Sequence, residues 1–205
     1  MILIGRYRSP FVRRVATTMR YYGMSYEHRP LQHTGEDIPA LRAINPIGRI
    51  PALVLDDGQV LVESGAIIDY LDREAGPDKA LIPPAGKARN HALTLIGVAT
   101  GSIDKFVACS YEIRFRPEEK RHAPWVERCQ GQVQAGFAWL NEQFEGEYML
   151  GDKLSQADIT VAIGWQSLGL GMKALQETIN APRLDALVGR MMQDDAFTST
   201  LPPPE

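Results

Sequence analysis

The chain has 205 residues, 44% hydrophobic and 23% charged, which is ordinary for a globular protein large enough to bury a core. Its 22 basic and 25 acidic residues give a formal net charge of −3, which argues against binding to nucleic acid or to an anionic membrane. No apolar run approaches the roughly 18 residues that span a bilayer, and the charged N-terminal segment is not a secretory signal, so we expect a cytoplasmic protein.

Residues 1–76 alternate strand and helix signals. The apolar run at 1–5 predicts a buried strand. Ser9 and Pro10 then predict a helix start, with the serine as N-cap and the proline at the first helical position, where its missing N–H costs nothing. Apolar residues at helical spacing continue this helix to a stop at Gly23.

The remainder of this half adds short elements separated by turn residues. In chain order we predict a strand at 25–29, a weak helix at 37–43, a turn at 45–48, a strand at 50–55, a tight turn at 56–58, a returning strand at 59–62 and a helix from 63 onward. The order strand, helix, strand, helix, strand, strand, helix is the thioredoxin-like topology. It predicts an α/β domain with a mixed sheet and helices on both faces.

Beyond residue 76 the pattern changes to helix almost throughout. The glycines and prolines of 77–86 predict a linker, and 87–205 an all-helical C-terminal domain. Its helices are expected at 87–111, 118–144 (with Pro124 interrupting or restarting it), 155–169 and 182–192.

Two other groups of residues are interpreted as structural. The short basic clusters Arg13–Arg14 and Lys120–His122 are interpreted as solvated faces. Cys109 and Cys129 are too few for a disulfide framework and too far apart in sequence for a zinc site, so both are interpreted as small core or helix-face residues. We expect no metal.

Ser9 is the first residue with a chemical interpretation. Alone it is an N-cap. It also follows the first strand, at the carboxyl end of the sheet, where α/β proteins bind ligands. A helix N-terminus attracts an anion, and a hydroxyl there can donate to a thiolate and lower the pKa of that thiol. The loop contains no cysteine, so the thiol would come from a ligand.

Two further segments leave alternatives open. Pro51 either forms a rigid trans turn or follows a cis bond, which would free the Ile50 backbone to pair with an extended peptide. Ser64 is either a second cap or, with its backbone N–H, a site for a carboxylate, while Glu63 takes an ammonium. The γ-glutamyl end of glutathione carries both groups on one carbon.

Together these segments resemble the glutathione transferase family. The resemblance is carried by the segments Ser-Pro-Phe-Val-Arg-Arg-Val, Asn-Pro-Ile-Gly-Arg-Ile-Pro, Glu-Ser-Gly-Ala-Ile and Gly-Asp-Lys-Leu-Ser-Gln-Ala-Asp-Ile, so it covers nearly the whole chain. The Ser-Pro-Phe motif and the insert at Arg116–Glu119 look like the bacterial serine-type members. The resemblance implies the glutathione transferase fold and a homodimer.

The resemblance also implies a role for each matching position. Ser9 matches the residue that hydrogen-bonds the glutathione thiolate, and Ile50, before an expected cis-Pro51, matches the backbone clamp on the cysteinyl part. Glu63 and Ser64 match the γ-glutamyl anchors. The glycyl carboxylate would meet Arg49 and, in a variable loop, His33. Ser155 and Asp158 match a capping box, which serves folding.

Departures from the family pattern argue against some of the activities found in the family. Members that isomerise maleylacetoacetate carry Ser-Ser-Cys where this chain has Arg8-Ser9-Pro10, which argues against that activity. Members that use a cysteine nucleophile need it at or near position 9, and none is present. Arg8 is also bulkier than the residue often found there and could alter access to the thiol.

The resemblance therefore implies an enzyme that conjugates glutathione, as co-substrate, to a small hydrophobic electrophile. In this fold the electrophile binds between the domains, and the candidates by position are Phe11, Phe106, Tyr111 and Trp165, although aromatic residues at helical spacing more often belong to a core. Two alternatives stay open: a glutathione-binding regulatory or adaptor protein without turnover, and a glutathione-dependent peroxidase or dehalogenase.

Overall fold

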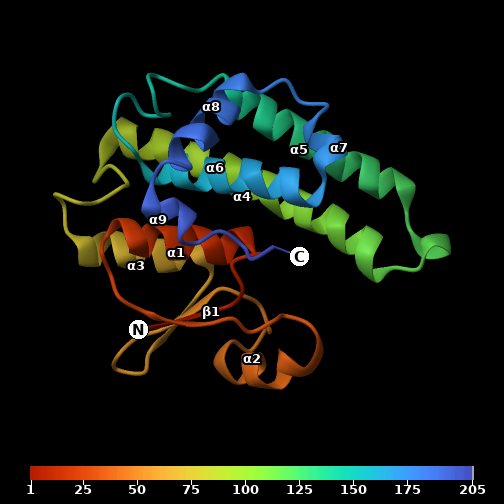
Figure 1. The fold of residues 1–205 in the computed structure, drawn as a ribbon, viewed down its shortest axis with the longest axis horizontal. Coiled ribbons are helices and arrows are strands. Elements are labelled where there is room, and N and C mark those ends of the chain that lie inside the picture. Colours follow the sequence, from red (N-terminus) through yellow and green to blue (C-terminus); the bar gives the residue numbers. More distant parts are fainter. Residues whose placement is uncertain (205) are drawn as a thin grey trace. The chain divides into compact units, whose positions relative to one another are not determined.

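The computed structural model describes residues 1–204, and the chain divides into two compact units. The first consists of Met1–Leu81 together with the C-terminal segment that starts at Met192, and the second of Ile82–Met191. Figure 1 shows the elements of each unit, which are described separately below.

The first unit contains a four-stranded mixed sheet. Its elements, in chain order, are β1 (Ile2–Ile4), α1 (Pro10–Tyr21), β2 (Glu27–Arg29), η1 (Gly35–Asp37), α2 (Ile38–Ile44), β3 (Ala52–Val54), β4 (Val60–Val62) and α3 (Ser64–Ala75). The strand order is β2-β1-β3-β4, with β1 and β2 parallel and the other pairs antiparallel. The predicted thioredoxin-like fold is confirmed.

Helices cover both faces of this sheet, as Figure 1 shows. The helices α1 and α3 pack against each other on one face. On the other face α2 contributes Leu41 to a cluster with Ile4 and Ala52. Neighbouring residues of a strand point to opposite faces, so the fully buried side chain of Leu3 in β1 points toward α1 and α3.

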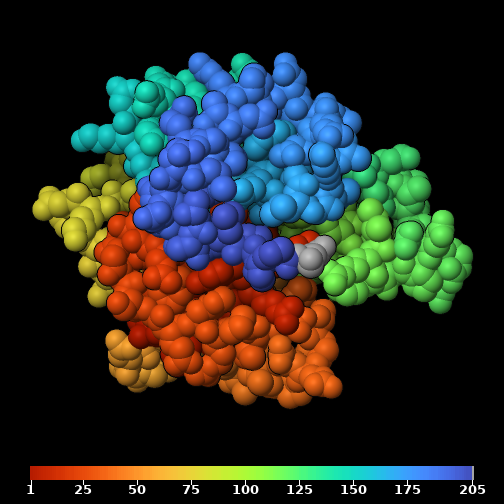
Figure 2. Space-filling model, in the orientation of Figure 1, coloured from red at the N-terminus to blue at the C-terminus, as the bar shows by residue number. Residues whose placement is uncertain are grey.

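The C-terminal segment packs on α1. Its short helix α9 (Asp195–Thr198) lies beside α1 in Figure 1, and the blue end of the chain covers the red residues in Figure 2. The centre of the Phe197 ring lies 4.4 Å from the Arg13 guanidinium, and the hydroxyl oxygens of Thr200 and Thr17 are 2.7 Å apart. The segment was expected within the helical domain; the structure groups it with the first unit, because its buried side chains contact α1.

The second unit is helical. It contains α4 (Gly86–Phe115), η2 (Glu118–Lys120), α5 (Ala123–Asn141), α6 (Gln156–Gly171), α7 (Lys173–Gln176) and α8 (Pro182–Met191). The helix expected over 118–144 is divided, because α5 begins anew with Pro124 in its first turn, where the missing N–H is tolerated. Cys109 and Cys129, predicted as structural residues, are both buried in this unit.

Helix α4 has an unusually apolar composition. Its most apolar 18 residues have a mean hydropathy of 1.4, so by length and composition it is the one helix within residues 1–204 that could cross a membrane. It packs against both α5 and α6, and its buried residues include Leu95, Ala99 and Ile103. These contacts are those of the central helix of a helical unit, and they account for its hydropathy.

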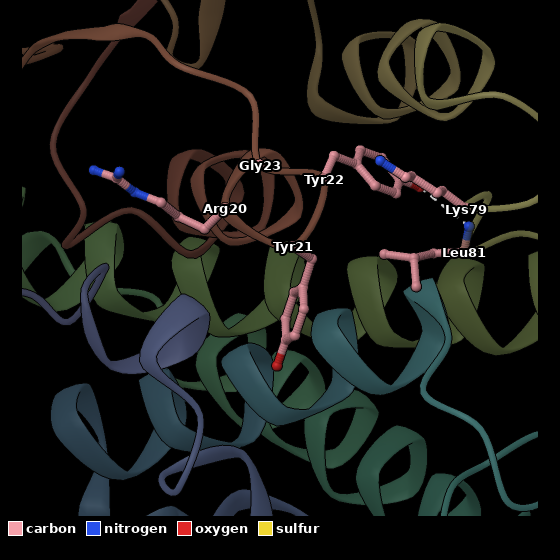
Figure 3. Close-up of a pocket in the computed structure, with 6 residues that line it drawn as sticks. All are labelled: Arg20, Tyr21, Tyr22, Gly23, Lys79 and Leu81. Carbon is pink, nitrogen blue, oxygen red and sulfur yellow. Dashed lines mark hydrogen bonds between the residues drawn. The ribbon is translucent and has the colours of Figure 1, made fainter.

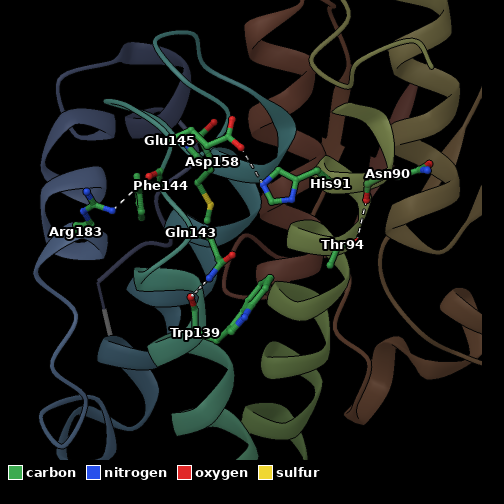
Figure 4. A network of polar contacts seen from close by, with 10 residues as sticks. Asn90, His91, Thr94, Trp139, Gln143, Phe144, Glu145, Asp158 and Arg183 are labelled. Atoms are coloured by element: carbon green, nitrogen blue, oxygen red, sulfur yellow. Dashed lines mark hydrogen bonds and ion pairs between the residues drawn. The ribbon is translucent and has the colours of Figure 1, made fainter. Parts of the chain in front are cut away.

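Polar contacts hold the loop after α5 against neighbouring helices of the same unit, as Figure 4 shows. His91 of α4 lies with Nε2 3.6 Å from the Glu145 carboxylate. Arg183 of α8 donates to the Phe144 carbonyl at 3.4 Å and lies 5.7 Å from the centre of its ring. The loop is therefore fixed to α4 on one side and to α8 on the other.

Candidate functional site

The register of the sheet brings the three predicted segments to one edge. Ile4 of β1 is paired with Ala52 of β3, and Ala52 is paired in turn with Val62 of β4. The loop that follows β1, the residues that precede β3 and the residues that follow β4 therefore all leave the sheet at the same end. These are the segments that contain Ser9, Ile50–Pro51 and Glu63–Ser64.

Ser9 caps the N-terminus of α1. Its Oγ accepts a hydrogen bond from the backbone N–H of Val12 at 3.4 Å, and its own N–H donates to the Arg6 carbonyl at 3.0 Å. An oxygen that accepts from the backbone still keeps its hydroxyl hydrogen for another partner. The half-buried Ser9 hydroxyl can thus donate to an anion placed at the positive end of α1.

The predicted solvated face at Arg13–Arg14 is wrong. These side chains are only 1% and 2% exposed, because α1 is covered on several sides by the rest of the first unit. Arg14 Nη1 donates to Ser64 Oγ at 3.2 Å. Burial lowers the pKa of Arg14 to about 10, and the nearby Glu63 carboxylate opposes this shift. Arg14 therefore remains a cation at neutral pH, directly behind Ser64.

Glu63 and Ser64 form a connected polar group at the start of α3. The Glu63 carboxylate accepts from the Gly65 backbone N–H at 2.8 Å and from the Ser64 hydroxyl at 3.2 Å. The backbone of Glu63 has a φ of 72°, a conformation that costs energy for a residue with a side chain. Ser64 is 1% exposed whereas Glu63 is exposed, so the group presents a carboxylate to solvent and is backed by a buried cation.

The segment before β3 has the conformation implied by the resemblance: the Ile50–Pro51 peptide bond is cis. Asn45, which is buried, donates from Nδ2 to the Arg49 carbonyl at 2.8 Å and so fixes the preceding turn. Within residues 1–204 no hydrogen bond uses the backbone N–H of Ile50. The exposed Arg49 and the half-buried His33 belong to the connections on either side of α2.

Comparison with known proteins identifies the family. Residues 3–79 match the model of the glutathione S-transferase N-terminal domain, and residues 123–162 match that of its C-terminal domain. A maleylacetoacetate isomerase from Pseudomonas aeruginosa is 32% identical over 168 residues, covering 78% of this chain and 77% of that protein. This chain belongs to the glutathione transferase family.

Solved structures of the family agree with this assignment. A glutathione transferase family member from Pseudomonas fluorescens Pf-5, with bound glutathione, is 32% identical with a TM-score of 0.88 and matches 99% of both chains. A glutathione S-transferase from Methylobacillus flagellatus KT, with glutathione bound, is 27% identical with a TM-score of 0.91, over 98% of this chain and 99% of that one. The predicted glutathione transferase fold is confirmed along nearly the whole chain.

The aromatic residues suggested for a second substrate differ in their surroundings. Trp165 is 3% exposed, donates from Nε1 to Asp185 at 2.8 Å and packs beside the Phe137 ring. Phe106 is also buried in the helical unit, whereas Tyr111 is 42% exposed. Phe11, in the first turn of α1, is half-buried. Trp165 and Phe106 have the environment of core residues, and a substrate-binding role for the four stays a prediction.

A cavity of about 480 Å³ lies at the other end of α1, away from Ser9. It is lined by Arg20, Tyr21, Tyr22, Gly23, Lys79 and Leu81. Figure 3 shows that the side chains of Arg20, Tyr21 and Tyr22 point in different directions and do not converge. The Tyr22 hydroxyl donates to Asp72 and accepts from the Leu81 N–H, so it is already occupied. This cavity contains none of the predicted site residues.

Sequence reasoning missed Arg14 and the residues that hold the Ser9 loop. For Arg14 the available signal was a cation next to the apolar Val15. The helix that carries it has small or apolar residues at 15–18 and no acidic residue in its first turn. Helical periodicity places Arg14 on a face, but only the tertiary fold shows that α3 covers this face. Tyr7, in the loop before Ser9, and His28, in β2, belong to no recognisable motif.

Proposed function

We propose that the protein is a glutathione transferase that stabilises the glutathione thiolate with Ser9 and conjugates it to a small hydrophobic electrophile. The observation that carries this proposal is the convergence of Ser9, Ile50 and Glu63–Ser64 at one edge of the sheet, with a hydroxyl hydrogen of Ser9 left to donate. Family members that match nearly the whole chain have been solved with glutathione bound, which supports the same co-substrate here.

Each part of glutathione has a group of matching chemistry in this arrangement. The Glu63 carboxylate would bind the γ-glutamyl ammonium, and Ser64, at the N-terminus of α3, would bind the adjoining carboxylate. The Ile50 backbone would pair with the cysteinyl part as an added strand does. Arg49 and His33 would meet the glycyl carboxylate. The tripeptide would thereby place its sulfur near Ser9.

The reaction then needs little more than ionisation and positioning. A free thiol titrates near pH ~8.5, so it is mostly protonated at neutral pH. Donation from the Ser9 hydroxyl and the positive end of α1 favour the thiolate, and the thiol proton passes to solvent. The sulfur forms a bond to the electrophilic carbon, and a leaving group departs or the resulting carbanion takes up a proton. Phe11, Phe106, Tyr111 and Trp165 remain the proposed contacts of the electrophile.

A second candidate activity is favoured by one comparison. The Pseudomonas aeruginosa relative is named a maleylacetoacetate isomerase, and a glutathione thiolate could serve such a reaction by adding to the double bond, allowing rotation and then leaving. The Arg8-Ser9-Pro10 sequence, in place of Ser-Ser-Cys, argues against it. Direct assay of cis–trans isomerisation with glutathione present distinguishes the two activities.

The test begins with glutathione binding and proceeds to turnover. Calorimetric titration is expected to show saturable binding at millimolar glutathione or below. Assays with aryl halides, enals, isothiocyanates and hydroperoxides are then expected to show conjugation. Binding without turnover on any of these, or on maleylacetoacetate, would favour the adaptor alternative, and turnover on hydroperoxides alone would favour the peroxidase. Absence of binding would contradict the proposal itself.

We also propose that the protein is a cytoplasmic homodimer. The support is the resemblance to the family; light scattering on the purified protein tests the dimer, and a value for a single chain would contradict it.

A further inference from the structure

The loop that carries Ser9 is attached to β2 by three side chains, which we call the aromatic platform: Tyr7, Tyr26 and His28. The rings of Tyr7 and His28 lie flat on one another, with centroids 4.0 Å apart and planes within 4°. The hydroxyls of Tyr7 and Tyr26 are 2.8 Å apart. His28 Nε2 lies 2.7 Å from the carbonyl oxygen of Gly5. Two residues of the loop, Gly5 and Tyr7, are thus joined to β2 and the residue before it.

The chemistry of this contact fixes the role of the histidine. A carbonyl oxygen can only accept, so Nε2 of His28 carries the hydrogen and donates it to Gly5. The N–H of Gly5 is used as well, since it donates to the Arg29 carbonyl at 2.9 Å. Gly5 is therefore held to β2 through both of its backbone polar groups.

Gly5 also lies between two parts of the candidate site. Its φ is 118°, and a β-carbon there would lie 2.6 Å from Val12 Cγ2 and 2.8 Å from Ile50 Cβ. Val12 is the residue whose N–H donates to Ser9, and Ile50 is the proposed backbone clamp. A displacement of Gly5 would therefore press its backbone against both residues. The position of Gly5 thus affects the geometry of the candidate site.

A short path connects the platform to the Ser9 hydroxyl. Tyr7 is two residues before Ser9, and the Ser9 N–H donates to the carbonyl of Arg6, which lies between Gly5 and Tyr7. Residues 5–9 thus form one hydrogen-bonded turn, held to β2 at its start and capping α1 at its end. The direction of the Ser9 side chain depends on the conformation of this turn.

Tyr7 itself is not placed as the thiolate donor. Its hydroxyl is paired with that of Tyr26, whose ring lies 5.0 Å from the Arg20 guanidinium. Burial, and then the hydrogen bond with Tyr7, raise the pKa of Tyr26, so this phenol stays protonated. The two tyrosines hold the loop, and Ser9 is left as the hydroxyl available to a ligand.

We propose that His28 is a positioning residue for catalysis: by donating to Gly5 and supporting Tyr7 it holds the Ser9 loop in the conformation that directs the serine hydroxyl at the thiolate. This inference rests on the proposed function. Because the γ-glutamyl anchors Glu63 and Ser64 lie on a different element, loss of the platform weakens thiolate stabilisation more than it weakens glutathione binding.

Two substitutions at His28 separate its two contacts. His28→Phe keeps a ring to stack on Tyr7 and removes the N–H donor, whereas His28→Gln keeps a donor for the Gly5 carbonyl and removes the ring. The pKa of the bound glutathione thiol is measured from the pH dependence of thiolate absorbance, and kcat, KM and the glutathione Kd are measured with the best electrophile. His91→Phe, in the helical unit, is the matched control.

We expect His28→Phe to raise the pKa of the bound thiol by about one unit and to lower kcat at neutral pH about 10-fold, with the glutathione Kd changed less than about 2-fold. His28→Gln should recover most of both losses, and His91→Phe should behave as wild type. The Ser9 amide should exchange faster with solvent in His28→Phe, which reports a loosened loop without reference to activity.

The outcomes are distinct. A folded His28→Phe with the wild-type thiol pKa and kcat overturns the inference, as does a variant in which only the Kd rises, or a His28→Gln that recovers nothing. If His28→Phe does not fold, Tyr7→Phe and Tyr26→Phe replace it, and each must raise the thiol pKa for the inference to stand. If the wild-type protein fails to bind glutathione or to ionise its thiol, the proposed function is overturned. If the wild type ionises the thiol and the His28→Phe variant does so equally well, only the role of His28 is overturned.

Discussion

At the scale of single residues, the Ser9 hydroxyl caps α1 and is the proposed donor to the thiolate, and Ser9→Ala removes both contacts. Ser9→Ala removes the donor to the thiolate, so we expect kcat/KM at neutral pH to fall on the order of 10²-fold. The pKa of the bound thiol should rise toward the ~8.5 of a free thiol. Steady-state kinetics over a pH series measures both effects, and Ser9→Thr, which keeps a hydroxyl, is the control. Unchanged turnover in Ser9→Ala would show that Ser9 is only a cap.

Arg14 is the second residue with a testable role, because its buried charge faces Ser64. Arg14→Met fills similar space without the charge and removes the donor to Ser64 Oγ. Without this donor and its charge, the Ser64 hydroxyl is no longer oriented toward the γ-glutamyl carboxylate that we propose it binds, so we expect the glutathione Kd to rise about 10-fold, the effect of about 1.4 kcal/mol. Calorimetric titration measures this change. Arg73→Met, on the exposed face of α3, should leave the Kd unchanged; equal effects in both variants would refute a specific role.

The sequence was informative about residues with a local motif and misleading about those defined by tertiary contacts. Ser9, Pro51 and the Glu63–Ser64 pair each stand at a recognisable turn or cap, so their positions could be predicted. Arg14 looked like any surface cation until the packing of α3 against α1 was known. The platform residue His28 lies in a short strand whose register with β1 places it beside Gly5, and a register of this kind has no local signal.

At the scale of elements, the start of α6 depends on one carboxylate. Asp158 accepts from the backbone N–H groups of Met149 and Ser155 at 2.8 Å and from the Ser155 hydroxyl at 2.6 Å, all buried. Asp158→Ala leaves these donors without a partner, and we expect the free energy of unfolding to fall by at least about 2 kcal/mol. Urea denaturation measures it. The exposed Asp78→Ala is the control, and a loss no larger than that of the control would contradict the capping role.

The order and type of the elements could be predicted because turn residues separate them clearly. The glycines, prolines and short apolar runs of the first half specified the order that the structure confirms. The division of the helix at 118–144 was harder, because its apolar spacing continues across Pro124. The proline is compatible with a first helical turn and equally with an interruption.

At the scale of the whole molecule, the first unit is made of two separate parts of the chain. Phe197 belongs to the C-terminal segment and is fully buried against α1, where its ring contacts the Arg13 guanidinium. Phe197→Ala should lower the free energy of unfolding by about 3–5 kcal/mol, as truncation of a buried aromatic residue does. Phe115→Ala, whose ring is 52% exposed, should cost far less. Denaturation curves compare the two, and similar losses would show that the segment contributes little.

The sequence assigned this segment to the helical domain because it directly follows the predicted helices. Nothing in its composition indicates which unit it joins. The assignment depends on Phe197 and Thr200 meeting Arg13 and Thr17, almost the whole length of the chain away. Contacts of such long sequence separation arise from tertiary packing, so periodicity and turn signals do not predict them.

This arrangement has a consequence for biosynthesis. Domains generally begin to fold in the order in which they leave the ribosome. The sheet and α1 emerge first, but the segment that covers Arg13 and Thr17 emerges only after the complete helical unit. One side of α1 in the nascent first unit therefore stays uncovered throughout translation of the second unit, and it is covered only after residues 192–204 have been synthesised.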